Sequence, residues 1–149
     1  RGDFSLVVPG QHGPLKFPSK WYHWYERDGL VHFIALDTNW VHSASICKAR
    51  NGSCNREPYE TCIARFSRER DEQAKWLQII LRNDSSTWRI VFGHHPVYAR
   101  WPVYDEDDTN ITLASLFAPI FEQFGVHVYI SGHNDCMRHF RHGIGYFVF

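Results

Sequence analysis

Apolar residues along the chain gather in short runs whose length and composition favour β-strands. Three such runs, at 31–36, 88–92 and 126–130, are mostly apolar, which is typical of strands buried in a sheet. Residues 21–25 and 145–149 are further strand candidates. The pattern therefore predicts a sheet with three buried strands at its centre.

Two stretches with helical spacing alternate with these strands. The first is expected at about 68–82, with Ser67 as its N-cap and apolar residues recurring on one face. The second, 113–124, carries a strong apolar stripe and ends at Gly125, a residue suited to a helix C-terminus. Pro119 inside it removes a backbone hydrogen bond and so predicts a kink or a late start.

The order strand, helix, strand, helix, strand indicates a largely parallel α/β sheet with right-handed crossovers. The remaining segments lack a sustained periodicity of hydrophobic residues. Residues 1–20 are rich in Gly and Pro and indicate an extended connection, 39–66 an insertion loop, and 100–110 a polar surface loop.

Composition and charge narrow the classes of partner. A chain of 149 residues with 44% hydrophobic and 21% charged residues has the size and content of one globular domain. No apolar run approaches the ~18 residues of a membrane-spanning helix. Because Lys+Arg and Asp+Glu are both 16, we expect no nucleic-acid partner and no membrane span in this sequence.

The cysteines and glycosylation motifs favour an oxidising compartment. Four cysteines allow three pairings, and their spacing differs from the short pairs of zinc sites: Cys47, Cys54, Cys62 and Cys136. We therefore expect a disulfide-held loop within 39–66. Three sequons in polar segments provide candidate N-glycosylation sites: Asn51, Asn83 and Asn110. These features indicate a secreted protein, or one of the endomembrane, lysosomal or vacuolar system.

Polar side chains follow the ends of all three buried strands. Asp37 follows the first, His94 the second, and His133 with Asp135 the third. The carboxyl ends of parallel strands share one edge of a sheet, where ligands bind, so His94 and His133 should meet there. Glycine precedes each of these two histidines, and imidazoles and carboxylates in such a place are metal ligands. The role of His95 stays open. We interpret the other histidines as ordinary surface or hydrogen-bonded residues: His12, His23, His32, His42, His127, His139 and His142.

A series of short motifs carries a family resemblance across nearly all of the chain. They are Phe17-Pro18-Ser19, Trp21-Tyr22, Leu36-Asp37-Thr38, Gln73-Ala74-Lys75-Trp76-Leu77, Val91-Phe92-Gly93-His94-His95-Pro96, and the string from Gly125-Val126 to Gly132-His133. In this order they resemble the C-terminal half of the catalytic domain of purple acid phosphatases, within the calcineurin-like metallophosphoesterases. The opening Arg1-Gly2-Asp3 resembles the segment that follows the Asn-His-Asp metal motif in small plant-type members.

The resemblance implies a partial metallophosphoesterase β-sandwich flanked by helices, with 1–149 as the C-terminal portion of one catalytic domain. It implies hydrolysis of phosphate monoesters at a dinuclear centre of Fe(III) with Fe(II), Zn(II) or Mn(II), and a small phosphorylated substrate. His94 and His133 resemble ligands of the divalent ion. Asp135 occupies the place of a ferric-ion histidine, and Arg100 is a candidate for neutralising substrate phosphate. Further ligand motifs are expected upstream, so this fragment alone should be inactive.

Two departures keep a second class of function open. The family's second histidine is Asp135 here, and the substrate-facing histidine expected about nine residues after His94 by family resemblance is absent from 97–110. The alternative is a catalytically weakened phosphatase-fold scaffold or binding protein, similar to the apicomplexan glideosome-associated anchor protein. A phosphodiesterase acting on nucleotides or nucleic acid is the third possibility, and the neutral charge argues against a polymeric substrate.

Overall fold

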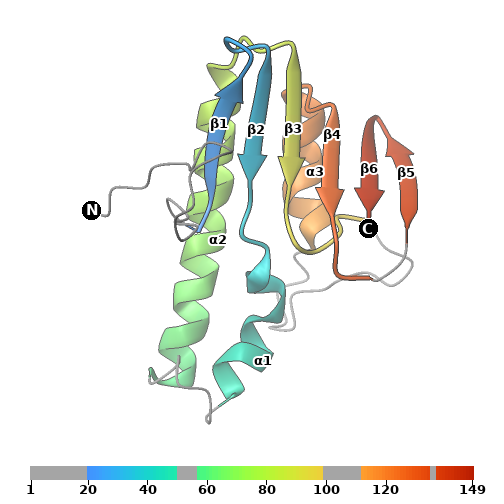
Figure 1. Cartoon of the computed structure of the whole chain (residues 1–149). Helices are drawn as coiled ribbons and strands as arrows, with labels where there is room; N and C mark the ends of the chain where they lie inside the picture. The colour runs from blue at the N-terminus through green and yellow to red at the C-terminus, as the bar shows by residue number, and fades with distance from the viewer. Residues whose placement is uncertain (1–19, 50–56, 99–111, 135–136) are drawn as a thin grey trace, which may run out of the picture.

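The computed structural model describes residues 20–49, 57–98, 112–134 and 137–149. Ten elements follow in chain order (Figure 1): β1 (Tyr22–Glu26), β2 (Val31–Ala35), the 3-10 helix η1 (Asn39–His42), α1 (Ser43–Lys48), α2 (Tyr59–Arg82), β3 (Trp88–Phe92), α3 (Leu113–Gln123), β4 (Val128–Ser131), β5 (Arg138–His142) and β6 (Ile144–Val148).

The strands form one six-stranded sheet in the order β1-β2-β3-β4-β6-β5. The pairs β2·β3, β3·β4 and β4·β6 are parallel, whereas β1 and β5 pair antiparallel at the two edges. Thus the α/β class and the parallel centre expected from the sequence are confirmed. A tight turn joins β1 to β2, where Arg27, Asp28 and Gly29 all have positive φ.

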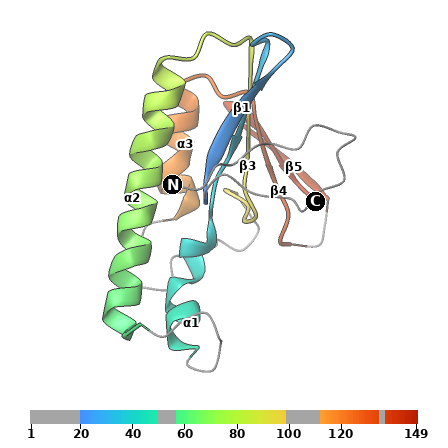
Figure 2. The same cartoon turned by 60° about the vertical axis from the view of Figure 1, so that its left-hand side comes forward.

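Helices α2 and α3 lie side by side against one face of the sheet (Figure 2). Leu77 and Phe117, one from each helix, are fully buried together with Val91 and Tyr129 from the central strands. Burial of such large side chains contributes about 1.5–3 kcal/mol each, so this layer carries most of the described core. The opposite face holds a row of half-buried aromatic rings, with Trp24 stacked on Phe33 at 5.0 Å.

The structure corrects the expected start of the long helix and the expected insertion loop. Helix α2 begins at Tyr59, not near Arg68, so Ser67 lies inside it rather than at its N-cap. Residues 39–48 are helical as well, because η1 and α1 occupy them. The prediction of a disulfide in this region is confirmed, since Cys47 of α1 is bonded to Cys62 of α2. Cys54 and Cys136 lie outside the described residues.

Two further expectations are resolved at the C-terminal side. Helix α3 begins at Leu113 with a capping box between Thr112 and Ser115, so a late start caused by Pro119 is wrong. The strand expected at the end of the chain is present as β6, and it pairs with an unexpected partner, β5. None of the helices in the described ranges is both long and apolar enough to cross a bilayer.

A buried polar network lies near the start of β2 and β3. The Asp84 carboxylate accepts from Arg89 Nε at 2.6 Å and from Ser86 Oγ at 2.8 Å. His32 Nδ1 is 3.1 Å from Asp84 Oδ2, and His32 Nε2 is 2.8 Å from His23 Nδ1. Burial raises the pKa of Asp84, but the surrounding donors outweigh it and lower the pKa to about 2.

Candidate metal centre

His94 and His133 meet at the carboxyl edge of the sheet, as their positions after parallel strands predict. His94 follows β3 by two residues, His133 follows β4 by two, and the Gly132 N–H donates to the His94 carbonyl at 3.1 Å. Nε2 of His94 lies 3.2 Å from Nδ1 of His133. Two nitrogens bound to one zinc ion at 2.0–2.1 Å lie about 3.4 Å apart at the tetrahedral angle. The pair therefore fits a shared cation.

His133 adopts a backbone conformation that is costly for its residue type. Its φ is 74°, in the left-handed region that non-glycine residues rarely occupy. Such a conformation costs about 1–3 kcal/mol and persists where the surrounding contacts fix it, often at binding sites. With this backbone turn, the His133 ring lies against the rings of His94 and His95, which follow β3, at centroid distances of 5.1 and 4.5 Å.

His95 is the buried member of the histidine group. Only 2% of it is exposed, its backbone N–H donates to Thr38 Oγ1 at 3.0 Å, and its ring Nδ1 lies 2.8 Å from the same oxygen. The Tyr129 hydroxyl donates to the His95 carbonyl at 2.8 Å. Burial, and then the neighbouring rings of His133, His42 and His94, lower the pKa of His95 to about 3. The His95 imidazole is therefore neutral near pH 7.

His42, which the sequence placed among the ordinary histidines, comes from the end of η1. Its ring centroid lies 4.8 Å from that of His95 and 5.6 Å from that of His133. One ring nitrogen from each of His42, His95 and His133 lies within 4.8 Å of the other two. Sequence spacing gave no signal for His42, because it follows β2 only through the turn of a 3-10 helix.

Close packing around Gly93 holds the two adjacent histidines in place. A Cβ atom at Gly93 would lie 2.6 Å from the Tyr129 hydroxyl and 2.9 Å from Thr38 Cγ2. The Gly93 N–H donates to the Ile130 carbonyl at 3.1 Å, which ties the end of β3 to β4. Glycine is thus required here by the close approach of its neighbours.

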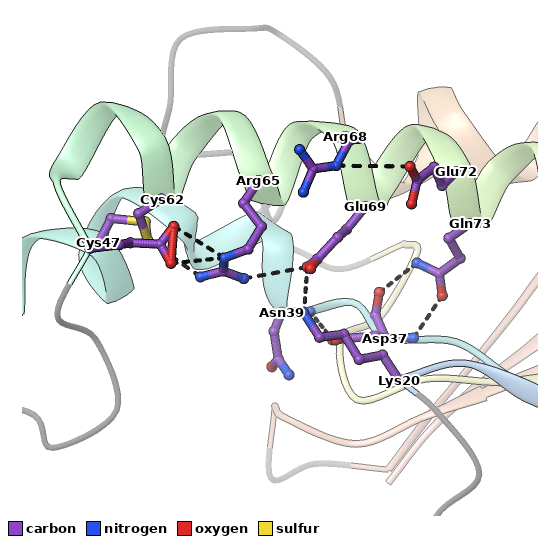
Figure 3. Close-up of polar contacts among 11 residues, drawn as sticks. Lys20, Asp37, Asn39, Cys47, Cys62, Arg65, Arg68, Glu69, Glu72 and Gln73 are labelled. Carbon is purple, nitrogen blue, oxygen red and sulfur yellow. Dashed lines mark hydrogen bonds and ion pairs between the residues drawn. A yellow bond between two sulfur atoms is a disulfide. The ribbon is translucent and has the colours of Figure 1, made fainter. Parts of the chain in front are cut away.

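Hydrogen bonds from helix α2 hold the segment that follows β2 in place (Figure 3). The Gln73 side chain accepts from the Asp37 N–H at 2.7 Å and donates to the Asp37 carbonyl at 2.8 Å. The Asp37 carboxylate accepts from the Asn39 N–H at 2.9 Å, so this side chain turns the chain into η1. These bonds place Thr38 next to His95, and the disulfide Cys47–Cys62 ties α1 to the same helix.

All but one of the remaining site residues expected from the sequence lie outside the described residues. Asp135, Arg100, Asn51 and Asn110 are not among the described residues, and Asn83 is exposed at the end of α2. The donor set at the sheet edge consists of imidazoles, which suit zinc, copper, nickel and iron ions. The described residues therefore fit a bound metal ion.

Comparison with known proteins places this geometry in a family. The family model of the calcineurin-like phosphoesterases matches residues 5–136, most of the chain. Purple acid phosphatases 17, 4 and 3 of Arabidopsis thaliana are 32%, 35% and 31% identical to it over 63, 63 and 65 residues. Those regions make up 42%, 42% and 44% of this chain but only 18%, 17% and 17% of the relatives.

A solved structure shares the fold. It is described as GAP50, the anchor in the inner membrane complex of Plasmodium, and it superimposes with a TM-score of 0.54 at 22% identity. The superposition covers 89% of this chain and 38% of that one. Such a likeness supports the fold alone, while the family match covers the strand ends that carry His94 and His133. The chain therefore belongs to the calcineurin-like phosphoesterase family and is similar to its purple acid phosphatases.

Proposed function

We propose that this chain is part of a metal-dependent acid phosphatase that hydrolyses phosphate monoesters at a dinuclear metal centre, and that the centre is incomplete within these 149 residues. The observation that carries the proposal is the 3.2 Å approach of His94 Nε2 to His133 Nδ1, which joins two motifs 39 residues apart. Membership of a phosphoesterase family supports the same chemistry.

The proposed roles follow from the donor chemistry. His94 and His133 hold the divalent ion, Fe(II), Zn(II) or Mn(II), through neutral imidazole nitrogens. Asp135 supplies a carboxylate to the Fe(III) ion, since a hard oxygen donor suits that ion, and Arg100 neutralises the substrate phosphate. When bound, the two ions provide charge stabilisation for the phosphoryl oxygens and an activated water.

The proposed location is the secretory pathway, ending in the extracellular space or a lysosomal or vacuolar compartment. The bond between Cys47 and Cys62 supports it, because disulfides persist in oxidising compartments. Asn83 of the sequon Asn83-Asp-Ser85 is exposed, so this glycosylation site is accessible in the fold. Glycosylation at Asn51, Asn83 and Asn110 is part of the proposal.

The test is metal analysis and turnover of p-nitrophenyl phosphate by the full-length parent protein. Two bound metal ions and activity at acid pH are expected. His133→Ala should lower kcat/KM by more than about 10–100-fold, because removal of a residue that only hydrogen-bonds to a metal ligand already has an effect of that size. His139→Ala is the matched control, because His139 is exposed on β5. A folded parent with neither metal nor turnover would overturn the proposal and favour the scaffold function.

A further inference from the structure

The histidine group holds more nitrogen donors than the His94–His133 pair requires. His42 and His95 lie beside His133, and neither belongs to a position that the family resemblance assigns to metal binding. We propose that His42, His95 and His133 together bind one divalent transition-metal ion through three imidazole nitrogens. The inference goes beyond the proposed function, because it assigns the His133 ring to a site with His42 and His95 as an alternative to the site with His94.

The three rings come from separate parts of the chain and converge at the sheet edge. His95 and His133 have ring centroids 4.5 Å apart, and His42 lies 4.8 Å from His95. Three nitrogens on one zinc ion lie about 3.4 Å from one another, so nitrogens that lie up to 4.8 Å apart need to approach by as much as about 1.4 Å. His133 is exposed and His42 is half-buried, so rotation of these two side chains can provide the movement.

His95 supplies the fixed ligand of the three. Its Nδ1 is engaged by Thr38 Oγ1 at 2.8 Å, which leaves Nε2 as the ring nitrogen for an ion. Metal-binding histidines usually have the other ring nitrogen held in this way, because the second contact sets the orientation of the ring. Tyr129 stabilises the arrangement further: burial raises the pKa of its hydroxyl, which stays protonated and donates to the His95 carbonyl.

The donor set selects the class of ion. Within the described part of the chain this cluster contains imidazoles and no carboxylate. Nitrogen donors of intermediate softness favour zinc and the later divalent transition metals, whereas Fe(III), Mg²⁺ and Mn²⁺ prefer oxygen. Zinc sites with three protein ligands keep the fourth position for water or substrate, so such a site remains open to a phosphate oxygen.

Cobalt(II) titration of the full chain tests the site, because a tetrahedral cobalt ion absorbs visible light and replaces zinc in nitrogen sites. We expect one bound equivalent with a tetrahedral spectrum, confirmed by calorimetric titration with Zn²⁺. His42→Ala should weaken metal binding by at least about 10–100-fold, because even the loss of a residue that only holds a metal ligand in place has an effect of that size. His139→Ala, outside the cluster on β5, should bind as the unmodified chain does.

The comparison of His42→Ala with His94→Ala decides between the two sites that share His133. Retained tetrahedral binding in His94→Ala, with loss in His42→Ala, supports the three-imidazole site. Unchanged binding in His42→Ala, with loss in His94→Ala, overturns it. Because His95 is buried, His95→Ala can fail to fold and is not used as the test. His42→Gln provides the second variant instead, and circular dichroism checks that it is folded. Cobalt binding through His42 in a parent that hydrolyses no ester would overturn the proposed function alone.

Discussion

Among the described glycines, Gly93 has the least room for a side chain. Gly93→Ala places a methyl group 2.6 Å from the Tyr129 hydroxyl and 2.9 Å from Thr38 Cγ2, and both of these residues hydrogen-bond to His95. We expect a loss of about 1–3 kcal/mol in the free energy of unfolding, the usual cost of overpacking. Urea unfolding measures it. Gly132→Ala is the control, since its nearest neighbour would be the Phe149 carbonyl at 3.6 Å. Equal losses in both variants would contradict the steric argument.

The buried histidines predict lower stability in acid. Burial lowers the pKa values of His23 and His32 below their ordinary 6.5, so the unfolded chain takes up protons first as the pH falls. Stability from these neutral rings is present above about pH 6.5 and is lost below it. The Asp84 contribution is lost at lower pH, between 3.8 and about 2, and in the same direction.

The midpoint of urea unfolding, measured between pH 7 and pH 5, tests this predicted loss of stability. We expect the midpoint to fall across that interval, and to fall less steeply in His23→Gln, which lacks one of the titrating rings. The slope should not vanish, because His32 and His95 remain. A midpoint that rises as the solution is acidified would contradict the assignment of neutral buried imidazoles.

Sequence reasoning reached part of the candidate centre. The Gly-His pairs after two parallel strands predicted that His94 and His133 would meet, because strand direction alone brings those ends together. The contribution of His42 depends on how η1 folds back over the sheet edge, and no local pattern encodes that path. The orientation of His95 likewise depends on a contact with Thr38, 57 residues away.

At the scale of elements, the bond between Cys47 and Cys62 links α1 to the first turn of α2. Its sequence separation is 15, and a loop of that length corresponds to about 3 kcal/mol of stabilisation through the unfolded chain. The double variant Cys47→Ala, Cys62→Ala should therefore have a lower melting temperature than the unmodified chain. Thermal unfolding monitored by circular dichroism measures the difference. Adding reductant should lower the melting temperature of the unmodified chain toward that of the variant.

Helices and strands were predictable from the sequence where a single hydrophobic pattern ran through the whole segment. β3 was predicted with its observed bounds, because its apolar run is short and ends just before Gly93 and the prolyl turn. Helix α2 was predicted to start too late because Ser67, a residue type that favours helix N-caps, lies inside the helix and not at its start. β5 gave no signal, since an edge strand in which Arg and His fill four of the five positions resembles a polar loop.

For the whole molecule, helices α2 and α3 cover one face of the sheet (Figure 2). The proposed metal ligands His94 and His133 lie just beyond the carboxyl ends of β3 and β4. We expect the 149-residue chain alone to show no turnover of p-nitrophenyl phosphate. Phosphate monoesters hydrolyse extremely slowly without catalysis, and the proposed reaction needs a second metal ion in addition to the one at His94 and His133. Steady-state assays at acid pH measure it. Hydrolysis by the chain that disappears in His94→Ala would contradict the proposed incomplete centre.

The parallel order of β2, β3 and β4 places the proposed metal ligands at one end of the sheet and the turn between β1 and β2 at the opposite end. That turn bends at Asp28 and Gly29, and a side chain built at Gly29 meets nothing within 4 Å. A fluorescent reporter or affinity peptide spliced between these two residues would leave the rings of His42, His94, His95 and His133 untouched. The bend is accordingly the natural attachment point for immobilising the protein on a sensor surface with its proposed metal site facing the solution.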